Sequence, residues 1–129
     1  MLIVFARCIF PSPPQSNVMK QSNIFTYIEL SKMIESLSLL SSSTKIKERL
    51  KAQGAYFNII DSKYFSEQLS REWEELVSQI KMQGSKINEE GIVVMNAVNN
   101  TINYMSEDEC DHFISRLYAL HNKVKNEFV

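Results

Sequence analysis

The chain has 129 residues, enough for one domain, and its composition excludes several classes of protein. Charged residues make up 22% and apolar residues 44% of it, which excludes an intrinsically disordered chain and a membrane-embedded one. Fourteen basic and fifteen acidic side chains give a net charge of −1, so the chain lacks the positive charge needed for general binding to nucleic acid.

The three glycines and three prolines are too few to supply the turns of an all-β sandwich or barrel. The two cysteines, Cys8 and Cys110, have no spacing typical of a disulfide framework or a metal site, so we interpret both as free thiols. No basic residues precede the apolar start of the chain, as they would in a secretory signal, and no apolar run is long enough to cross a membrane. We therefore expect a cytoplasmic protein with no cofactor and no association with membranes.

The first 22 residues differ in composition from the rest of the chain. An apolar run from Leu2 to Phe10 is followed by three prolines between positions 11 and 14 and by a polar stretch to Ser22. Proline fixes φ and removes a backbone donor, so this part cannot continue into a helix. We predict an extended arm or tail over residues 1–22 and a helical domain over residues 23–129.

From residue 22 onward the spacing of apolar residues predicts helices. A cap at Ser22 or Asn23 begins the first helix, which ends in a cluster of serines. Its expected apolar face consists of Ile24, Tyr27, Ile28, Ile34 and Leu37. A short second helix, with Ile46 and Leu50 on one face, follows Thr44 and ends before Gly54, where we expect a left-handed residue. Residues 55–60 are either a buried connector or a brief strand.

A third predicted helix opens at Asp61 or Ser62 and ends at Gly84, and its apolar face consists of Phe65, Leu69, Trp73, Leu76 and Ile80. A fourth begins at Asn88, where the spacing of Ile87 and Ile92 suggests a hydrophobic staple. Its apolar face is predicted to hold Val94, Val98, Ile102 and Met105.

The fifth predicted helix starts with the capping-box pair Ser106 and Glu109. Its inner face is expected to hold Cys110, Phe113, Leu117, Leu120, Val124 and Phe128. Taken together, these patterns predict an all-α fold, a compact bundle of four to five helices.

Four asparagines, Asn96, Asn99, Asn100 and Asn103, have the spacing of one helix face within the fourth predicted helix. Asparagine is a poor helix former, costing roughly half a kcal/mol relative to alanine, so the row does not serve helix stability. Amides both donate and accept hydrogen bonds, which suits binding to a polar protein surface. The alternative is an ordinary solvated face.

Glu109 and His112 have the Glu-x-x-His spacing found in di-iron helical bundles. That kind of site needs a second such pair, and the other histidine, His121, has Tyr118 at the matching position. Glu109 also has a role already, as the capping-box partner of Ser106. We therefore expect no metal site.

Four residues separate Arg116 from His121, and this Arg-x4-His spacing resembles the motif of HEPN-type ribonucleases. The resemblance covers these two residues. It implies a small all-helical protein that pairs two such helices across a dimer interface. There, the Arg would polarise the scissile phosphate of RNA and the His would move the proton of the attacking 2′-hydroxyl.

The leading interpretation of function is a non-catalytic helical module that binds another protein, in an adaptor, inhibitor, antitoxin or immunity role. The alternative is a HEPN-like ribonuclease that uses Arg116 and His121 at the interface of a homodimer. A third possibility is a domain of a larger protein, because the chain stops at Val129 inside a helical pattern with Phe128 still apolar.

Overall fold

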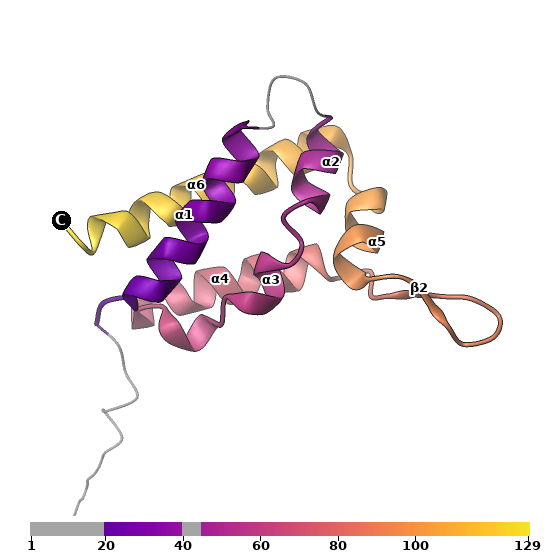
Figure 1. Cartoon of the computed structure of the whole chain (residues 1–129), viewed down its shortest axis with the longest axis horizontal. Helices are drawn as coiled ribbons and strands as arrows, with labels where there is room; N and C mark the ends of the chain where they lie inside the picture. Colours follow the sequence, from indigo (N-terminus) through magenta and orange to yellow (C-terminus); the bar gives the residue numbers. More distant parts are fainter. Residues whose placement is uncertain (1–19, 40–44) are drawn as a thin grey trace, which may run out of the picture.

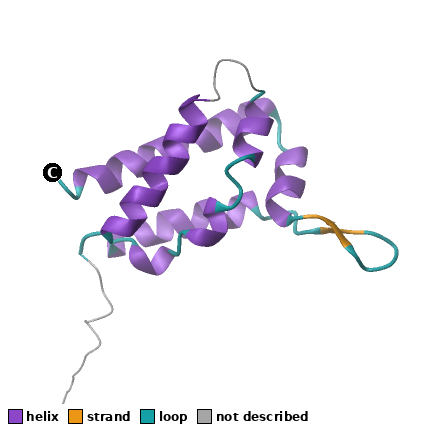
Figure 2. Ribbon diagram, in the orientation of Figure 1, coloured by secondary structure: helices purple, strands orange, loops and turns teal. Residues whose placement is uncertain are grey.

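The computed structural model describes residues 20–39 and 45–129, and it confirms the prediction of an all-α helical bundle (Figure 1, Figure 2). The elements in chain order are α1 (Ile24–Leu39), α2 (Ile46–Lys51), α3 (Tyr56–Ile59), the 3-10 helix η2 (Ser62–Tyr64), α4 (Glu67–Ile80), β1 (Lys86–Ile87), β2 (Val93–Met95), α5 (Ala97–Tyr104) and α6 (Glu107–Asn126). The extended arm predicted over residues 1–22, and Cys8 within it, lie outside the described residues apart from positions 20–22.

Helix α6 is the central element of the bundle, since it packs against α1, α2 and α4. The predicted capping box begins it: Ser106 Oγ accepts from the Glu109 amide at 3.0 Å, and the Ser106 amide donates to the Glu109 carboxylate at 2.7 Å. Three acidic residues in its first turn and two lysines in its last complement the helix dipole. Five of the six predicted inner residues are fully buried, and Phe128 packs partly buried against them.

Trp73 on α4 occupies the middle of the core, as predicted, and is only 1% exposed. Its indole stacks on the ring of Phe57 at a centroid distance of 5.7 Å and on that of Phe65 at 5.4 Å. Phe57 belongs to α3, in the segment 55–60 that the sequence predicted to be either a buried connector or a brief strand. Phe57 and Ile60 are buried, whereas Ile59 is 52% exposed, so the segment is only partly a buried connector. It forms one turn of helix, and the strand alternative is wrong.

The face that α1 buries matches the predicted one only in part, since Leu37 is buried and Tyr27 and Ile34 pack partly buried against the core. The helix buries Thr26, Leu30, Met33 and Leu37, whereas Ile24 and Ile28 are exposed. Apolar residues occur nearly all round this helix, so their spacing did not determine which side faces the core.

Gly54 does not adopt the left-handed conformation predicted for it. The chain turns through residues 52–55 in a right-handed path that leads straight into α3. A β-carbon at Gly54 would lie 3.3 Å from the carbonyl oxygen of Lys51 and 3.6 Å from Val98, so the small residue allows a close approach instead.

The largest correction concerns residues 86–95, where the sequence predicted the start of a helix and the structure has an antiparallel β-hairpin. The Asn88 side chain accepts from the amides of Glu90 and Ile92, both at 3.0 Å, and Gly91 has φ +82°. These two features make a tight turn that a helix cannot contain. The predicted staple between Ile87 and Ile92 does not form, and helix α5 begins only at Ala97.

Candidate functional site

The hairpin formed by residues 86–95 projects away from the helices at one end of the bundle (Figure 2). Its four large aliphatic side chains, Ile87, Ile92, Val93 and Val94, are between 54% and 59% exposed. Three of them are consecutive, so apolar groups cover both faces of the ribbon. Within the described residues the sheet has only these two strands, and the outer edge of each is unpaired.

Helix α5 holds the base of the hairpin through three polar side chains. The buried Thr101 accepts from the Gln83 amide at 3.0 Å, and the Asn100 amide group donates to the carbonyl of Gly84 at 2.9 Å. Asn103 lies 3.1 Å from the sulfur of Met95 on the outgoing strand. Both legs are therefore attached to the bundle, whereas the rest of the hairpin projects free of it (Figure 1).

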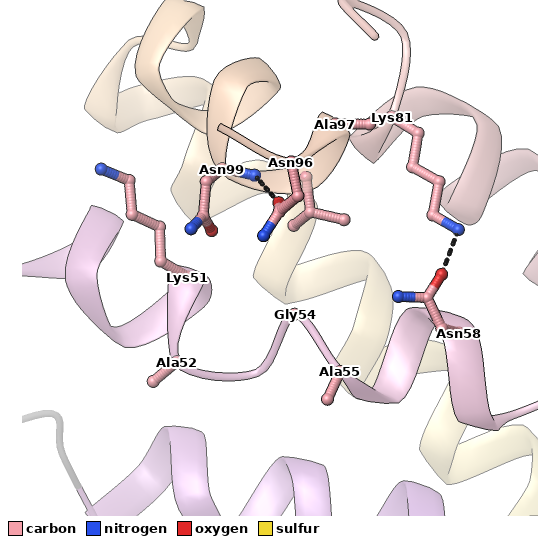
Figure 3. A pocket seen from close by; sticks show the side chains of 10 residues that line it. Lys51, Ala52, Gly54, Ala55, Asn58, Lys81, Asn96, Ala97 and Asn99 are labelled. Carbon is pink, nitrogen blue, oxygen red and sulfur yellow. Dashed lines mark hydrogen bonds between the residues drawn. The ribbon is translucent and has the colours of Figure 1, made fainter. Parts of the chain in front are cut away.

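The four asparagines predicted as a binding row have different surroundings, and only three of them lie within α5. Asn96 precedes α5 and caps it, with its Oδ1 accepting from the amide of Asn99 at 2.8 Å. Asn100 and Asn103 face the base of the hairpin. Only Asn96 and Asn99 remain together, and both line a cleft of about 460 Å³ beside the start of α5 (Figure 3).

Arg116 and His121 lie on α6 but contact different helices. One guanidinium nitrogen of Arg116 donates to the Gln79 side chain on α4 at 2.8 Å, and another lies 3.9 Å from Glu75. His121 Nε2 lies 2.9 Å from Ser31 Oγ, on the side of α1. Within one chain the two groups therefore do not meet at a shared phosphate position.

The imidazole of His121 also stacks on the ring of Tyr27, at a centroid distance of 5.8 Å. Burial lowers the pKa of His121, and the positive charge of Lys125 lowers it further. The lowered pKa favours the neutral ring, which packs between α1 and α6 through its contacts with Tyr27 and Ser31.

The remaining candidates from the sequence, the metal-site residue Glu109 and the thiol of Cys110, both have structural roles. Glu109 serves the capping box, and within residues 20–39 and 45–129 no three His, Cys, Asp or Glu side chains gather in a way that could hold a metal ion. Cys110 is a free, fully buried thiol, and burial raises its pKa, which disfavours the nucleophilic thiolate. No helix in the described ranges has the length and hydropathy to cross a membrane.

No family model, curated protein or solved structure matches the chain, so the functional argument depends on its own geometry. The projecting hairpin is the feature that sequence reasoning missed. Its signal was present: Asn88 and Gly91 surround a turn, and the β-branched run Ile92–Val94 follows it. Helical spacing to Val98 and Ile102 outweighed that signal.

Proposed function

We propose that the chain is a non-catalytic module that binds another protein, in an adaptor, inhibitor, antitoxin or immunity role, and that the hairpin is its binding surface. The observation that supports this proposal is the exposure of four aliphatic side chains on both faces of a projecting two-stranded ribbon. An isolated two-stranded hairpin is only marginally stable in water. A partner that covers these side chains stabilises the ribbon while it gains apolar contact area.

The chemistry of the hairpin also indicates how a partner binds. The unpaired edge of β2 offers backbone donors and acceptors for an added strand, and its apolar side chains offer contacts above and below that strand. Exposed charges at Lys86, Glu89 and Glu90 surround the apolar residues and form a polar rim. We therefore propose a partner that contributes an extended, apolar segment to the edge of the hairpin.

Site-specific photo-crosslinking in the native host tests this proposal. A photoreactive residue at Val94 should capture a protein partner, whereas the same residue at Ile28, an exposed aliphatic position on α1, should not. With that partner purified, Val94→Lys should weaken binding about tenfold or more, and Ile28→Lys should leave the affinity within about twofold of wild type.

Two results would contradict the proposal. If the partner is captured at Ile28 and not at Val94, the hairpin is not the binding surface. If Val94 captures only a second copy of the chain, the hairpin is a self-association surface and the adaptor role is wrong. Circular dichroism of both lysine variants checks that the helices are retained. We expect them to be, because neither substitution changes a buried residue.

A further inference from the structure

The cleft beside α5 lies between the segment that joins α2 to α3 and the two ends of the hairpin connection (Figure 3). We call it the amide cleft and define it by Lys51, Asn58, Lys81, Asn96 and Asn99. Its volume of about 460 Å³ lies within the range of small-molecule sites, roughly 300 to 1,000 Å³. Alanines and Gly54 supply much of the remaining wall, so short side chains keep the space open.

Hydrogen bonds to the side-chain oxygens of Asn58 and Asn96 fix the orientation of these two amides and leave their NH2 groups free to donate. Asn58 Oδ1 accepts from Lys81 Nζ at 2.5 Å, and Asn96 Oδ1 accepts from the backbone of Asn99 at 2.8 Å. The amide nitrogens of Asn58 and Asn96 therefore stay available, and Figure 3 shows both directed toward the space over Gly54. The Asn99 side chain, in the same wall, adds a third amide with no hydrogen-bond partner among the described residues.

The charges of the cleft have one sign. Lys51 and Lys81 lie at its two ends, and no aspartate or glutamate is among the described residues that line it (Figure 3). The nearest carboxylate to Lys51 is that of Glu48, at 3.6 Å, on a side chain that is 60% exposed. Such a pair is weak because water screens it, so the ammonium group remains able to attract an anion.

The start of helix α5 is not what makes this site. The cap that Asn96 provides already takes up the amide of Asn99, and the donors argued here are side chains from three different segments. Several amide donors and two cations, without a competing carboxylate, match the acceptor oxygens of an oxyanion. Inorganic phosphate alone would leave much of the volume empty.

We propose that the amide cleft binds a small organic anion, a compact molecule that carries a carboxylate or a phosphate group. The two lysines attract the charge, and the amides of Asn58, Asn96 and Asn99 donate to its oxygens. This inference is independent of the protein-binding role of the hairpin. The site also includes residues on both sides of the hairpin connection, because Lys81 precedes it and Asn96 follows it.

Nuclear magnetic resonance of the full chain tests the proposal, since the side-chain amide groups report on binding directly. Inorganic phosphate and succinate are the two probes, each titrated at constant pH and ionic strength against chloride. Either probe should produce saturable shifts in the amide signals of Asn58, Asn96 and Asn99, and the probe that saturates at lower concentration identifies the preferred group. Shifts that chloride reproduces, or that do not saturate, would overturn the proposal.

A pair of matched variants separates binding from stability. Asn99→Asp places a negative charge in the cleft and breaks no side-chain hydrogen bond within the described residues, and an acidic residue in the first turn of a helix is favourable. It should weaken binding of the preferred probe about tenfold or more, whereas Asn122→Asp on exposed α6 should leave binding within about twofold of wild type. Equal affinities for the two variants would refute the site.

A second pair of variants tests the cations. Lys51→Met with Lys81→Met should weaken binding by about the same factor, and Lys63→Met with Lys123→Met removes two positive charges elsewhere as the control. If the control weakens binding as much, net charge and not the cleft attracts the anion, and the proposal fails.

Discussion

The indole nitrogen of Trp73 donates a hydrogen bond to the backbone carbonyl of Ile60 at 3.0 Å, inside the core. This bond joins the middle of α4 to the end of α3, so the largest apolar side chain of the protein also satisfies a buried backbone acceptor. Packing and polar satisfaction at this position can therefore be separated experimentally.

Trp73→Phe should keep most of the ring packing but leave the Ile60 carbonyl without a donor, which costs about 1 to 3 kcal/mol of unfolding free energy. Trp73→Ala should cost about 3 to 5 kcal/mol, because it also removes the stacking on Phe57 and Phe65. Urea denaturation measures both values. A loss below about 1 kcal/mol for the alanine variant would show that the core does not depend on this side chain.

Two serines at helix starts allow a matched test of capping. Ser106 Oγ accepts from the Glu109 amide, so Ser106→Ala should lower the unfolding free energy by about 1 kcal/mol. Ser66 occupies the same position before α4, but its buried hydroxyl makes no hydrogen bond within residues 20–39 and 45–129. Ser66→Ala should therefore be neutral or slightly stabilising. Equal losses from the two substitutions, measured in urea, would contradict the assigned caps.

The environment of His121 predicts a pH dependence of stability. Burial and Lys125 lower its pKa from the ordinary value of 6.5, so the unfolded chain takes up the proton more readily than the folded chain. The contribution of this residue is complete above pH 6.5 and is lost as the pH falls through that value toward the lower folded pKa.

Urea midpoints at several pH values between about 5.5 and 7.5 measure this effect. His121→Gln should flatten the pH dependence of stability across that window. The control His112→Gln, on an exposed side of α6, should retain that dependence because it leaves the contacts of His121 with Tyr27 and Ser31 in place. A flattened profile in the His112 variant and an unchanged one in the His121 variant would reverse the assignment.

Alanine substitutions in the asparagine group should have opposite effects on stability. Asn96→Ala removes the cap of α5 and should cost about 1 kcal/mol. Asn99 lies within the helix, and its side chain makes no hydrogen bond to any described residue, so Asn99→Ala should stabilise by a few tenths to about half a kcal/mol through helix propensity. Thermal unfolding measures both effects. If both variants were stabilised equally, the result would contradict the cap and support the alternative interpretation of the asparagines as an ordinary solvated helix face.

The parts of the fold that local chemistry determines were predictable. The capping box at Ser106, the inner face of α6 and the core position of Trp73 each depend on spacing within one helix, and all three are confirmed. The buried face of α1 was predictable only in part, because Ile24 and Leu30 are equally apolar and only the neighbouring helices decide between them.

The candidate site was harder to predict than the fold. Asn96 to Asn103 fit a helix face by spacing, but the turn at Asn88 and Gly91 delays the helix until Ala97. The cleft depends on Lys51, Asn58 and Lys81 from segments far apart in sequence, and no local pattern connects them to Asn99. Tertiary contacts alone bring these groups together.

The position of the hairpin has a consequence for the covalent continuity of the chain. Its tip, with Glu89 and Glu90 exposed, lies between a part that carries α1 to α4 and a part that carries α5 and α6. Because α6 packs against α1, α2 and α4, a single cut by a glutamate-specific protease at the tip would leave two fragments held together by the shared core. The two fragments, produced separately, should therefore reassociate into one folded, two-piece protein.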